Sequence, residues 1–237
     1  MVDYIEFGDN CLPFIFLREV LYIKEKSLFS LGVFDFNNIL KYIQTDNYED
    51  ICKKEYLTYD NKPISNFYDK IKNYSQSPKI VNTKYDFGFS HDFNYDVSNN
   101  CINNYNFVAN KFTAKIKDFK LKLKNEKALM FINFSFYNAI NNIKIDEMIN
   151  VLNKMINKKY YIFFFFYDYQ RMPNNIEDQY SELCKNKFNK YDNVKVIFLK
   201  SDFSNWWNED DKVKQVLYGE MREGFLKICS ESNIRIF

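Results

Sequence analysis

The chain has 237 residues, a nearly balanced set of 33 basic and 31 acidic side chains, five cysteines and a single histidine, His91. One histidine excludes every mechanism that needs two, such as a multi-histidine zinc centre or the HExxH helix of metalloproteases. A formal charge of +2 without a basic tract gives no indication of nucleic acid or an anionic membrane as a partner. The length is sufficient for one sizeable hydrophobic core.

The N-terminal sequence has no apolar stretch of the secretory type, and the longest strongly apolar run, Tyr160–Tyr167, is far shorter than the ~20 residues of a membrane span. We therefore expect a soluble, cytoplasmic protein. The abundant Asn, Lys, Ile, Phe and Tyr favour an AT-rich source genome, such as that of a large DNA virus, and the compartment would then be the host cytoplasm. The cysteines are odd in number and form no CxxC pair, so we expect neither disulfides nor a metal, and no motif calls for a cofactor.

The N-terminal half predicts a strand, a turn and a helix, followed by less regular chain. Apolar spacing gives a strand at Tyr4–Phe7, a tight turn ending at Cys11, and a helix at Leu12–Tyr22 with Pro13 in its first turn, where proline is tolerated. Downstream we expect a helix near 36–44, an irregular insertion or lid near 46–83, a strand at Tyr85–Phe89 and an amphipathic helix at about 107–124.

The C-terminal half alternates strands with helices. Strands are predicted at Lys127–Phe134, Tyr160–Tyr167, Val194–Leu199 and, more weakly patterned, Ile234–Phe237, with helices near 145–157, 176–189 and 210–229. The apolar run at 160–167 has no polar alternation, which is typical of a strand covered on both faces. The sequence therefore predicts one α/β domain over residues 1–237, with a mostly parallel open sheet and helices on both faces, of the Rossmann or flavodoxin kind.

Ligand sites of open parallel sheets form beyond the carboxyl ends of the strands. In the predicted arrangement this edge collects a thiol, the only imidazole and several polar groups: Cys11, His91, Asp92, Asn133, Ser135, Asp168, Ser201 and Asp202. We expect the substrate, a protein or peptide, to be bound by polar residues around a reactive pair: Asp9, Asn10, Arg18, Asp92, Asn133, Asp168 and Asp202.

Cys11 is the sharpest candidate nucleophile. At the start of a helix, free backbone N–H groups and the positive end of the helix dipole lower a thiol pKa and can also stabilise an oxyanion. With His91 as the base and a carboxylate such as Asp35, Asp168 or Asp202 as its orienting partner, the set suits acyl transfer through a thioester. The alternatives are a Cys11 that packs the turn and a His91 that is satisfied by a backbone partner.

The chain contains Phe7-Gly8-Asp9-Asn10-Cys11, then Leu17-Arg18 and Phe34-Asp35-Phe36, and later His91-Asp92-Phe93. In this order, these four segments resemble a family of bacterial and large-DNA-virus proteins described as papain-like cysteine peptidases. The match covers most of residues 5–135. The resemblance implies Cys11 as nucleophile, His91 as general base and Asp35 as an orienting or structural acid.

The chain departs from the family pattern at several positions. Val33 stands where the family has proline, Ala114-Lys115 where it has a pair of arginines, and Asn133 where it has another arginine. An inactive member that serves as an interaction protein is therefore an open alternative.

The alternation of strands and helices also differs from papain itself, which combines a helical half with a β-barrel half. We predict the fold from the alternation of strands and helices, and we take from the resemblance only the order of the cysteine and the histidine. On such a scaffold the enzyme could equally be a thiol hydrolase or an acyltransferase. A third alternative is a sugar- or nucleotide-handling transferase, for which Trp206-Trp207 would be the stacking platform.

Overall fold

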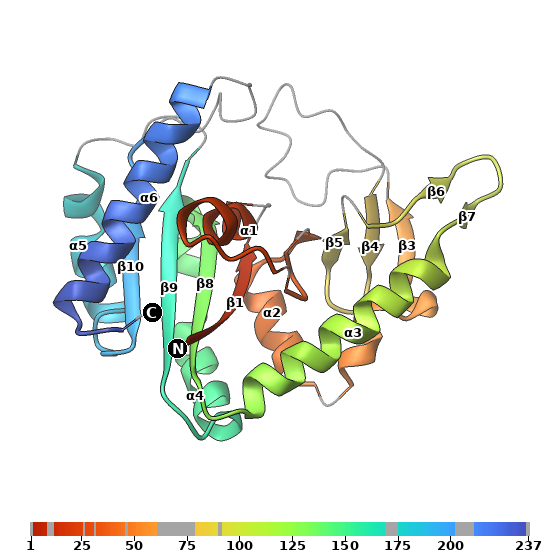
Figure 1. The fold of residues 1–237 in the computed structure, drawn as a ribbon, viewed down its shortest axis with the longest axis horizontal. Helices are drawn as coiled ribbons and strands as arrows, with labels where there is room; N and C mark the ends of the chain where they lie inside the picture. The colour runs from red at the N-terminus through yellow and green to blue at the C-terminus, as the bar shows by residue number, and fades with distance from the viewer. Residues whose placement is uncertain are drawn as a thin grey trace.

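Figure 1 shows the computed structural model of the chain. The residues that it describes are 2–8, 12–25, 27–30, 32–45, 47–60, 79–89, 92–168, 175–201 and 211–235.

A four-stranded, all-parallel sheet forms one half of the molecule. Its strands are β1 (Val2–Gly8), β8 (Ala128–Phe136), β9 (Tyr160–Tyr167) and β10 (Val194–Phe198), in the order β1-β8-β9-β10. Gly8 of β1 lies opposite Phe134 of β8, which lies opposite Phe165 of β9. The predicted α/β class with a parallel sheet is confirmed, and the predicted strand at 160–167 matches β9 at both ends.

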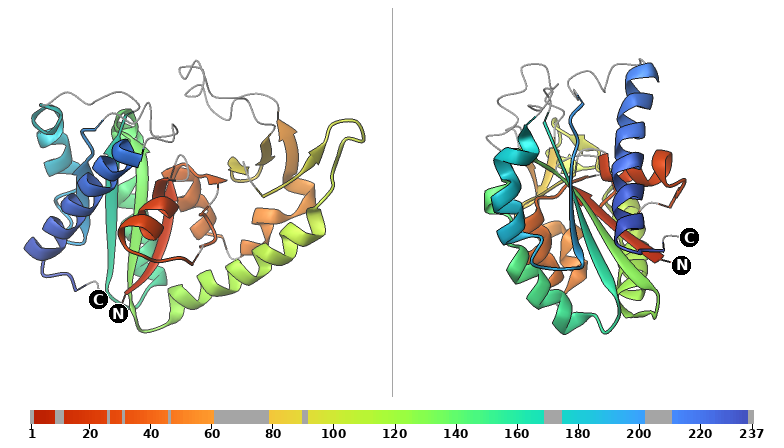
Figure 2. Two further views of the ribbon diagram at one scale, coloured as in Figure 1. Left: turned by 45° about the horizontal axis from the view of Figure 1, so that its top comes forward. Right: turned by 90° about the vertical axis from the view of Figure 1, so that its left-hand side faces the viewer.

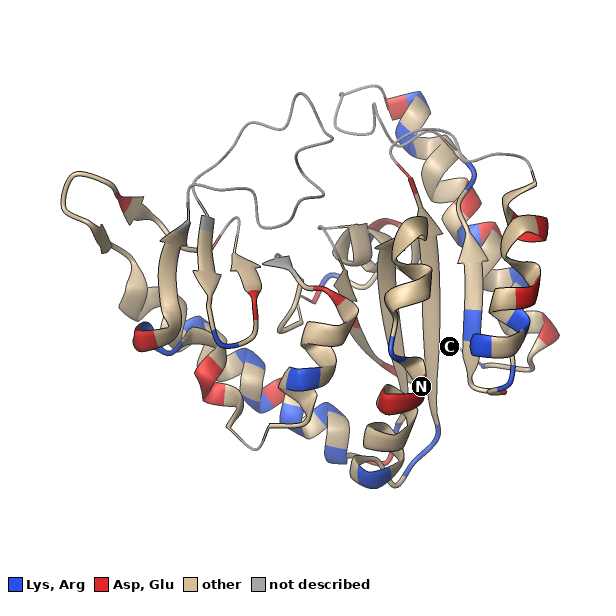
Figure 3. Cartoon of the chain, turned by 180° about the vertical axis from the view of Figure 1, so that it is seen from behind, with Lys and Arg blue, Asp and Glu red and all other residues tan. Residues whose placement is uncertain are grey.

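Helices cover both faces of this sheet (Figure 2). One face carries α2 (Phe36–Ile43), α4 (Ile145–Met155) and α5 (Ile176–Lys187). The other face carries α1 (Leu12–Ile15), the π-helical turn η1 (Phe16–Val20) and α6 (Asp211–Glu231). Lys, Arg, Asp and Glu lie mostly on the helices, whereas the central strands are nearly free of them (Figure 3).

The aromatic run of β9 explains why both faces are covered. Phe163 and Phe165 turn to one face, where the Phe225 ring of α6 lies 4.9 and 6.5 Å from their ring centroids. Phe164 and Phe166 turn to the other face, where the Phe188 ring that follows α5 lies 5.1 and 6.0 Å away. Successive strand side chains point to opposite faces, so an uninterrupted aromatic run needs a helix layer on each side.

A second, antiparallel sheet was not predicted. It has the order β2-β5-β4-β3, with β2 at Gly32–Val33, β5 at Phe87–Phe89, β4 at Lys79–Asn82 and β3 at Leu57–Asp60. The strand predicted at 85–89 therefore exists as β5 but belongs to this sheet, not to the parallel one. The segment predicted as irregular near 46–83 contains β3, β4 and two 3₁₀ turns, η2 (Tyr48–Cys52) and η3 (Lys54–Tyr56); its residues 61–78 lie outside the described part.

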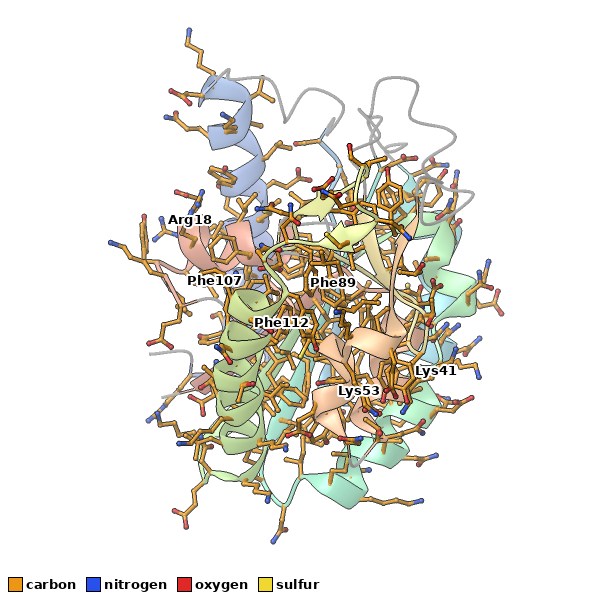
Figure 4. The ribbon with its side chains drawn as sticks, turned by 90° about the vertical axis from the view of Figure 1, so that its right-hand side faces the viewer. Arg18, Lys41, Lys53, Phe89, Phe107 and Phe112 are labelled. Carbon is orange, nitrogen blue, oxygen red and sulfur yellow. The ribbon has the colours of Figure 1, made fainter. Side chains whose placement is uncertain are left out.

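The long helix α3 (Tyr105–Lys124) lies against the second sheet and the first strand. Before it comes a small hairpin of β6 (Tyr95–Asp96) and β7 (Cys101–Ile102), and after β8 the turn η5 (Tyr137–Asn142). The ring of Phe112 lies 5.4 Å from that of Phe89 (Figure 4). Phe29 contacts Phe7 of β1, Phe87 of β5 and Phe119 of α3, so one continuous hydrophobic core joins the two sheets.

The helix predicted at 12–22 does not keep α-helical geometry along its whole length. The chain changes from α to π geometry at Phe16, and the N–H of Leu21 donates to the Phe16 carbonyl at 3.2 Å. Tyr22 then takes a positive φ of 59°, which ends the helix. At the C-terminus, Ile234 and Arg235 are not in a strand, contrary to the expectation for 234–237, whose last two residues lie outside the described part.

Candidate functional site

Several of the predicted site residues fall where the structure gives no description. These are Asp9, Asn10 and Cys11 after β1, His91 after β5 and Asp202 after β10. The described residues on either side of them define where the chain enters and leaves these segments.

The entry to the Cys11 segment is Gly8, the last residue of β1. A Cβ at this position would collide with the carbonyl oxygen of Phe134 and lie 3.0 Å from Cγ of Pro13. Glycine is therefore required by the close approach of β1 to β8. The Gly8 carbonyl accepts a hydrogen bond of 2.8 Å from the N–H of Phe34, which follows β2. The end of β1 is thus held against the start of the second sheet.

The entry to the His91 segment is Phe89, the last residue of β5. Phe89 is paired with Gly32 of β2, two residues before Phe34. Strand geometry of ~3.3 Å per residue and ~5 Å between paired strands puts Phe89 on the order of 10–15 Å from Gly8. Along the sequence, Cys11 follows Gly8 by three residues and His91 follows Phe89 by two.

Asp35 is the N-cap of α2. Its side chain accepts a hydrogen bond of 2.8 Å from the N–H of Asn37. This bond satisfies one of the free N–H groups at the start of the helix. Because Asp35 directly follows Phe34, its main chain lies beside the end of β1. The helix-capping bond gives this carboxylate a structural role at the candidate site.

Asp92 is buried and forms an ion pair with Lys111 of α3, with an N–O distance of 2.5 Å. Its carbonyl accepts a hydrogen bond of 2.8 Å from the side chain of Asn104. These two contacts fasten the chain directly after His91 to α3. Asp92 was predicted as a substrate-binding residue; only 3% of its side chain is exposed, so the geometry favours a positioning role.

Asn133 and Ser135 lie on β8 but not at a free end. Asn133 is opposite Phe7, its side chain is fully buried, and its amide donates to the Phe7 carbonyl at 3.4 Å. The Ser135 hydroxyl donates to Oδ1 of Asn133 at 2.8 Å. Asn133 was expected at the end of its strand, but the strand continues to Phe136. The Asn133 amide therefore binds the main chain near the end of β1 and does not lie at the open edge of the sheet.

Asp168 follows β9 and is half-buried. Burial, and secondarily the Asp168 carboxylate, raise the pKa of Tyr137, which follows β8. Asp168 and Tyr137 therefore lie near each other at the carboxyl edge of the parallel sheet, as predicted for Asp168.

Arg18 lies on η1 and is exposed (Figure 4). It pairs with Glu19 at 2.5 Å and lies 5.4 Å from the centre of the Phe14 ring. It also lines a surface pocket of about 590 Å³ between η1 and the first turns of α6, together with Asp211 and Tyr218. Arg18 is therefore directed toward α6.

Glu6 of β1, two residues before Gly8, is a buried carboxylate whose structural role the sequence did not reveal. Its carboxylate is fully buried and accepts hydrogen bonds from the N–H of Ser27, at 3.3 Å, and from the hydroxyl of Ser30. Burial raises the pKa of this carboxyl above its ordinary value, and the serine contacts only partly oppose that effect. Within the described part of the chain, its second oxygen, Oε2, has no hydrogen-bond partner. Glu6 holds the segment that leads into β2 against β1.

The other four cysteines differ in accessibility. Cys52, Cys184 and Cys229 are buried, and burial raises the pKa of Cys52, and those of Cys184 and Cys229 to about 11. Such thiols are poor nucleophiles because the thiolate is the reactive form. Cys101 is exposed on β7, where its thiol lies 3.2 Å from Oδ1 of Asn103.

Among the described residues, no cluster of His, Cys, Asp and Glu has the arrangement of a metal site, and no helix is long and apolar enough to cross a membrane. Comparison of the chain with family models, with curated proteins and with solved structures finds no match. The resemblance to papain-like cysteine peptidases therefore stays a prediction that rests on the motifs around Cys11, Asp35 and His91.

Proposed function

We propose that the protein is a cysteine peptidase or related thiol hydrolase, with Cys11 as the nucleophile and His91 as the general base. The observation that supports this proposal is the hydrogen-bonded path from Gly8 through Phe34 and β2 to Phe89. This path links Gly8, which precedes the Cys11 segment, to Phe89, which precedes the His91 segment. No other imidazole exists in the chain, so a Cys–His mechanism requires His91.

In the proposed reaction, the Cys11 thiolate attacks the carbonyl carbon of an amide or ester and forms a C–S bond. The protonated His91 donates its proton to the leaving amine or alcohol as that bond breaks, which leaves a thioester. A water molecule, deprotonated by His91, then attacks the thioester carbonyl, and the acid product leaves as the thiolate is restored.

We also propose that the scaffold is an open parallel sheet of the Rossmann or flavodoxin kind, with helices on both faces. Among the described strands, the order β1-β8-β9-β10 follows the chain in one direction, with β1 at one edge of the parallel sheet and β10 at the other. The pairing of α1 and η1 with α6 on one face, opposite α2, α4 and α5, supports this proposal. In open parallel sheets, ligands bind beyond the carboxyl ends of the strands, and the ends of β1 and β8 belong to that edge.

The test is the pH dependence of Cys11 alkylation by iodoacetamide, followed by peptide mass spectrometry. The measurement is made on a Cys101→Ser variant, because Cys101 is the exposed thiol among the four that the structure describes and would otherwise react as well. Cys11 should react faster than the buried Cys52, Cys184 and Cys229, with an apparent pKa below the ordinary ~8.5. Replacing His91 by Ala should move that apparent pKa upward, because the stabilising imidazolium is lost.

Two results would contradict the proposal. One is a Cys11 that is as slow as the three buried thiols in the folded protein and equals them only after denaturation. The other is a His91→Ala variant with an unchanged pH profile, which would show that the imidazole is not beside the thiol.

A second candidate function is that of an interaction protein on the same scaffold. It is favoured by two of the three positions where the family has arginines, the third being Lys115: Ala114 is exposed on α3, and Asn133 is fully buried on β8, beside β1. Neither supplies a cation to the candidate site. This function predicts that Cys11→Ala and His91→Ala leave the protein's biological effect intact, whereas the peptidase function predicts its loss.

A further inference from the structure

The outer edge of the parallel sheet is open at β10. This strand is the last in the sheet order, and it pairs only with β9 among the described strands. The right-hand view of Figure 2 looks onto this edge and shows β10 between α5 and α6, with no described element in front of it. A groove of about 650 Å³ runs there, lined by Val196, Ile197 and Phe198 of β10 and by residues of α5 and α6.

The main chain of β10 presents a row of hydrogen-bonding groups to this groove. Asn193 and Leu199 bond to β9 through their carbonyl and N–H, at 2.8 Å each. Because the direction alternates along a strand, the N–H and C=O of Val196 and Phe198 point away from β9. Among the described residues, none forms a hydrogen bond with these four groups. They form a free edge of the kind that can pair with a further strand.

The groove ends at a carboxylate cap. Glu220 of α6 accepts hydrogen bonds from the N–H groups of Lys200 and Ser201, the latter at 3.1 Å. These N–H groups follow the free edge at its carboxyl end. The cap leaves a short open stretch, centred on Val196 and Phe198, for one extended segment of a few residues.

The charge of the lining is acidic. Four carboxylates and two ammonium groups line the groove: Glu177, Glu220, Glu223, Glu231, Lys200 and Lys227. Lys200 is already paired with Glu177 at 3.2 Å, and Glu220 is occupied by its main-chain donors. Glu223 and Glu231, one turn to either side of Lys227 on α6, have no ion-pair partner among the described residues and can face an incoming cation.

We infer that β10 binds an extended, lysine- or arginine-bearing peptide segment by strand addition. Main-chain hydrogen bonds to Val196 and Phe198 hold the segment, and its alternate side chains face the carboxylates of α6. A second copy of this chain is a poorer occupant, because symmetric pairing of two β10 edges would oppose two acidic grooves. This surface is separate from the proposed Cys11–His91 site and does not depend on its chemistry.

The first test uses a labelled synthetic decapeptide that alternates lysine with threonine or valine, with fluorescence anisotropy as the measurement. We expect a Kd of ~1–100 µM at low salt, in the range of small transient interfaces. A peptide with glutamate in place of lysine should bind at least about tenfold more weakly. The lysine peptide N-methylated at its four central residues should not bind measurably, because both of its edges lose their donors.

The second test changes the protein. Val196→Pro removes one outward N–H and places a ring on the edge, where proline is tolerated because that N–H does not bond to β9. Val196→Pro should raise the Kd of the lysine peptide at least about tenfold. The matched Val196→Thr variant should bind this peptide with the Kd of the parent protein. A thermal melt of both variants distinguishes loss of the edge from loss of the fold. Glu223→Gln combined with Glu231→Gln should weaken binding severalfold and reduce its salt dependence.

Three outcomes would overturn the inference. The first is no binding of the lysine peptide at millimolar concentration. The second is equal binding of the N-methylated peptide or equal binding by a folded Val196→Pro protein, since either would show that strand pairing is not involved. The third is a concentration-dependent dimer in sedimentation that Val196→Pro converts to a monomer, since the occupant of the edge would then be a second copy of the chain.

Discussion

The buried carboxyl of Glu6 makes stability depend on pH in a direction that is unusual for an acid. In the unfolded chain a glutamate titrates near ~4.3. In the folded protein, burial raises its pKa, so between the two values the folded state holds a proton that the unfolded state has released. The free energy of unfolding therefore falls as pH rises between the unfolded and the folded pKa of Glu6. Below the lower pKa and above the higher one, the contribution of Glu6 does not change with pH.

Glu6→Gln isolates this effect. Glutamine keeps an oxygen that can accept from the Ser27 N–H and the Ser30 hydroxyl, and it cannot ionise. One proton contributes up to about 1.4 kcal/mol per pH unit. For a chain of this size, about 1 kcal/mol corresponds to ~2–4 °C in Tm, so the Tm of the variant minus that of the parent should increase by about 3–6 °C per pH unit within the window.

The assay is a series of thermal melts by circular dichroism from pH 4 to pH 9, with Glu25→Gln as a control at an exposed position. The control should follow the parent at every pH. The reasoning about Glu6 would be refuted by a Tm difference that is flat across the series, or by one that decreases as pH rises. The second result would mean that the folded state stabilises the charged form.

Other predictions concern close packing and one buried ion pair. Gly8→Ala should destabilise the protein by about 1–3 kcal/mol in urea unfolding, because the added Cβ collides with the Phe134 carbonyl; the matched Gly219→Ala has nothing within 4 Å and should stabilise α6 by up to ~1 kcal/mol. Equal effects of the two substitutions would contradict the steric argument. Lys111→Met should cost more than Asp92→Asn, because it leaves the buried Asp92 charge unpaired, and a double-mutant cycle measures the coupling. The reverse order would show that the carboxylate is solvated. Phe225→Ala should cost about 3–5 kcal/mol, since its ring is fully buried against Phe16, Phe163 and Phe165, and a loss below about 1 kcal/mol would indicate that α6 is not part of the cooperative core.

The parallel sheet was predictable from sequence because its strands are long and apolar. Tyr160–Tyr167 carries eight consecutive aromatic or aliphatic residues, all of them buried, and the flanking helices repeat apolar residues with helical spacing. Here the local pattern and the tertiary environment agree, so periodicity alone located the elements to within one or two residues at most ends.

The second sheet was not predictable in the same way. Its strands have two to four residues, too few to establish a period of two, and β3 and β4 are separated by a polar segment in the sequence. Pairing partners such as Gly32 and Phe89 are also far apart along the chain. The expectation that β5 continued the parallel sheet was wrong for this reason.

The candidate site was predictable in part. Asp168 lies at the carboxyl edge, as its position after a buried strand indicated. Glu6 was missed because a single acid between two apolar residues in a strand normally reads as a solvent-facing position, and its burial depends on Ser27 and Ser30 from a distant loop. The role of Asp92 likewise depends on Lys111, nineteen residues away on a helix whose docking the sequence does not specify.

The pairing of β1 with β8 also affects how the chain is made. Val2–Gly8 pairs with Ala128–Phe136 along its whole length, across an intervening stretch of about 120 residues. At a ribosomal rate of about 5–20 residues per second, the first strand waits on the order of 6–24 s before its partner is synthesised. During that interval its apolar face and main-chain edge are exposed to other nascent chains. We expect this delay to make folding depend on chaperones and to cause inclusion-body formation at high expression rates. Slower translation of the β8 codons should lengthen the delay and increase both effects.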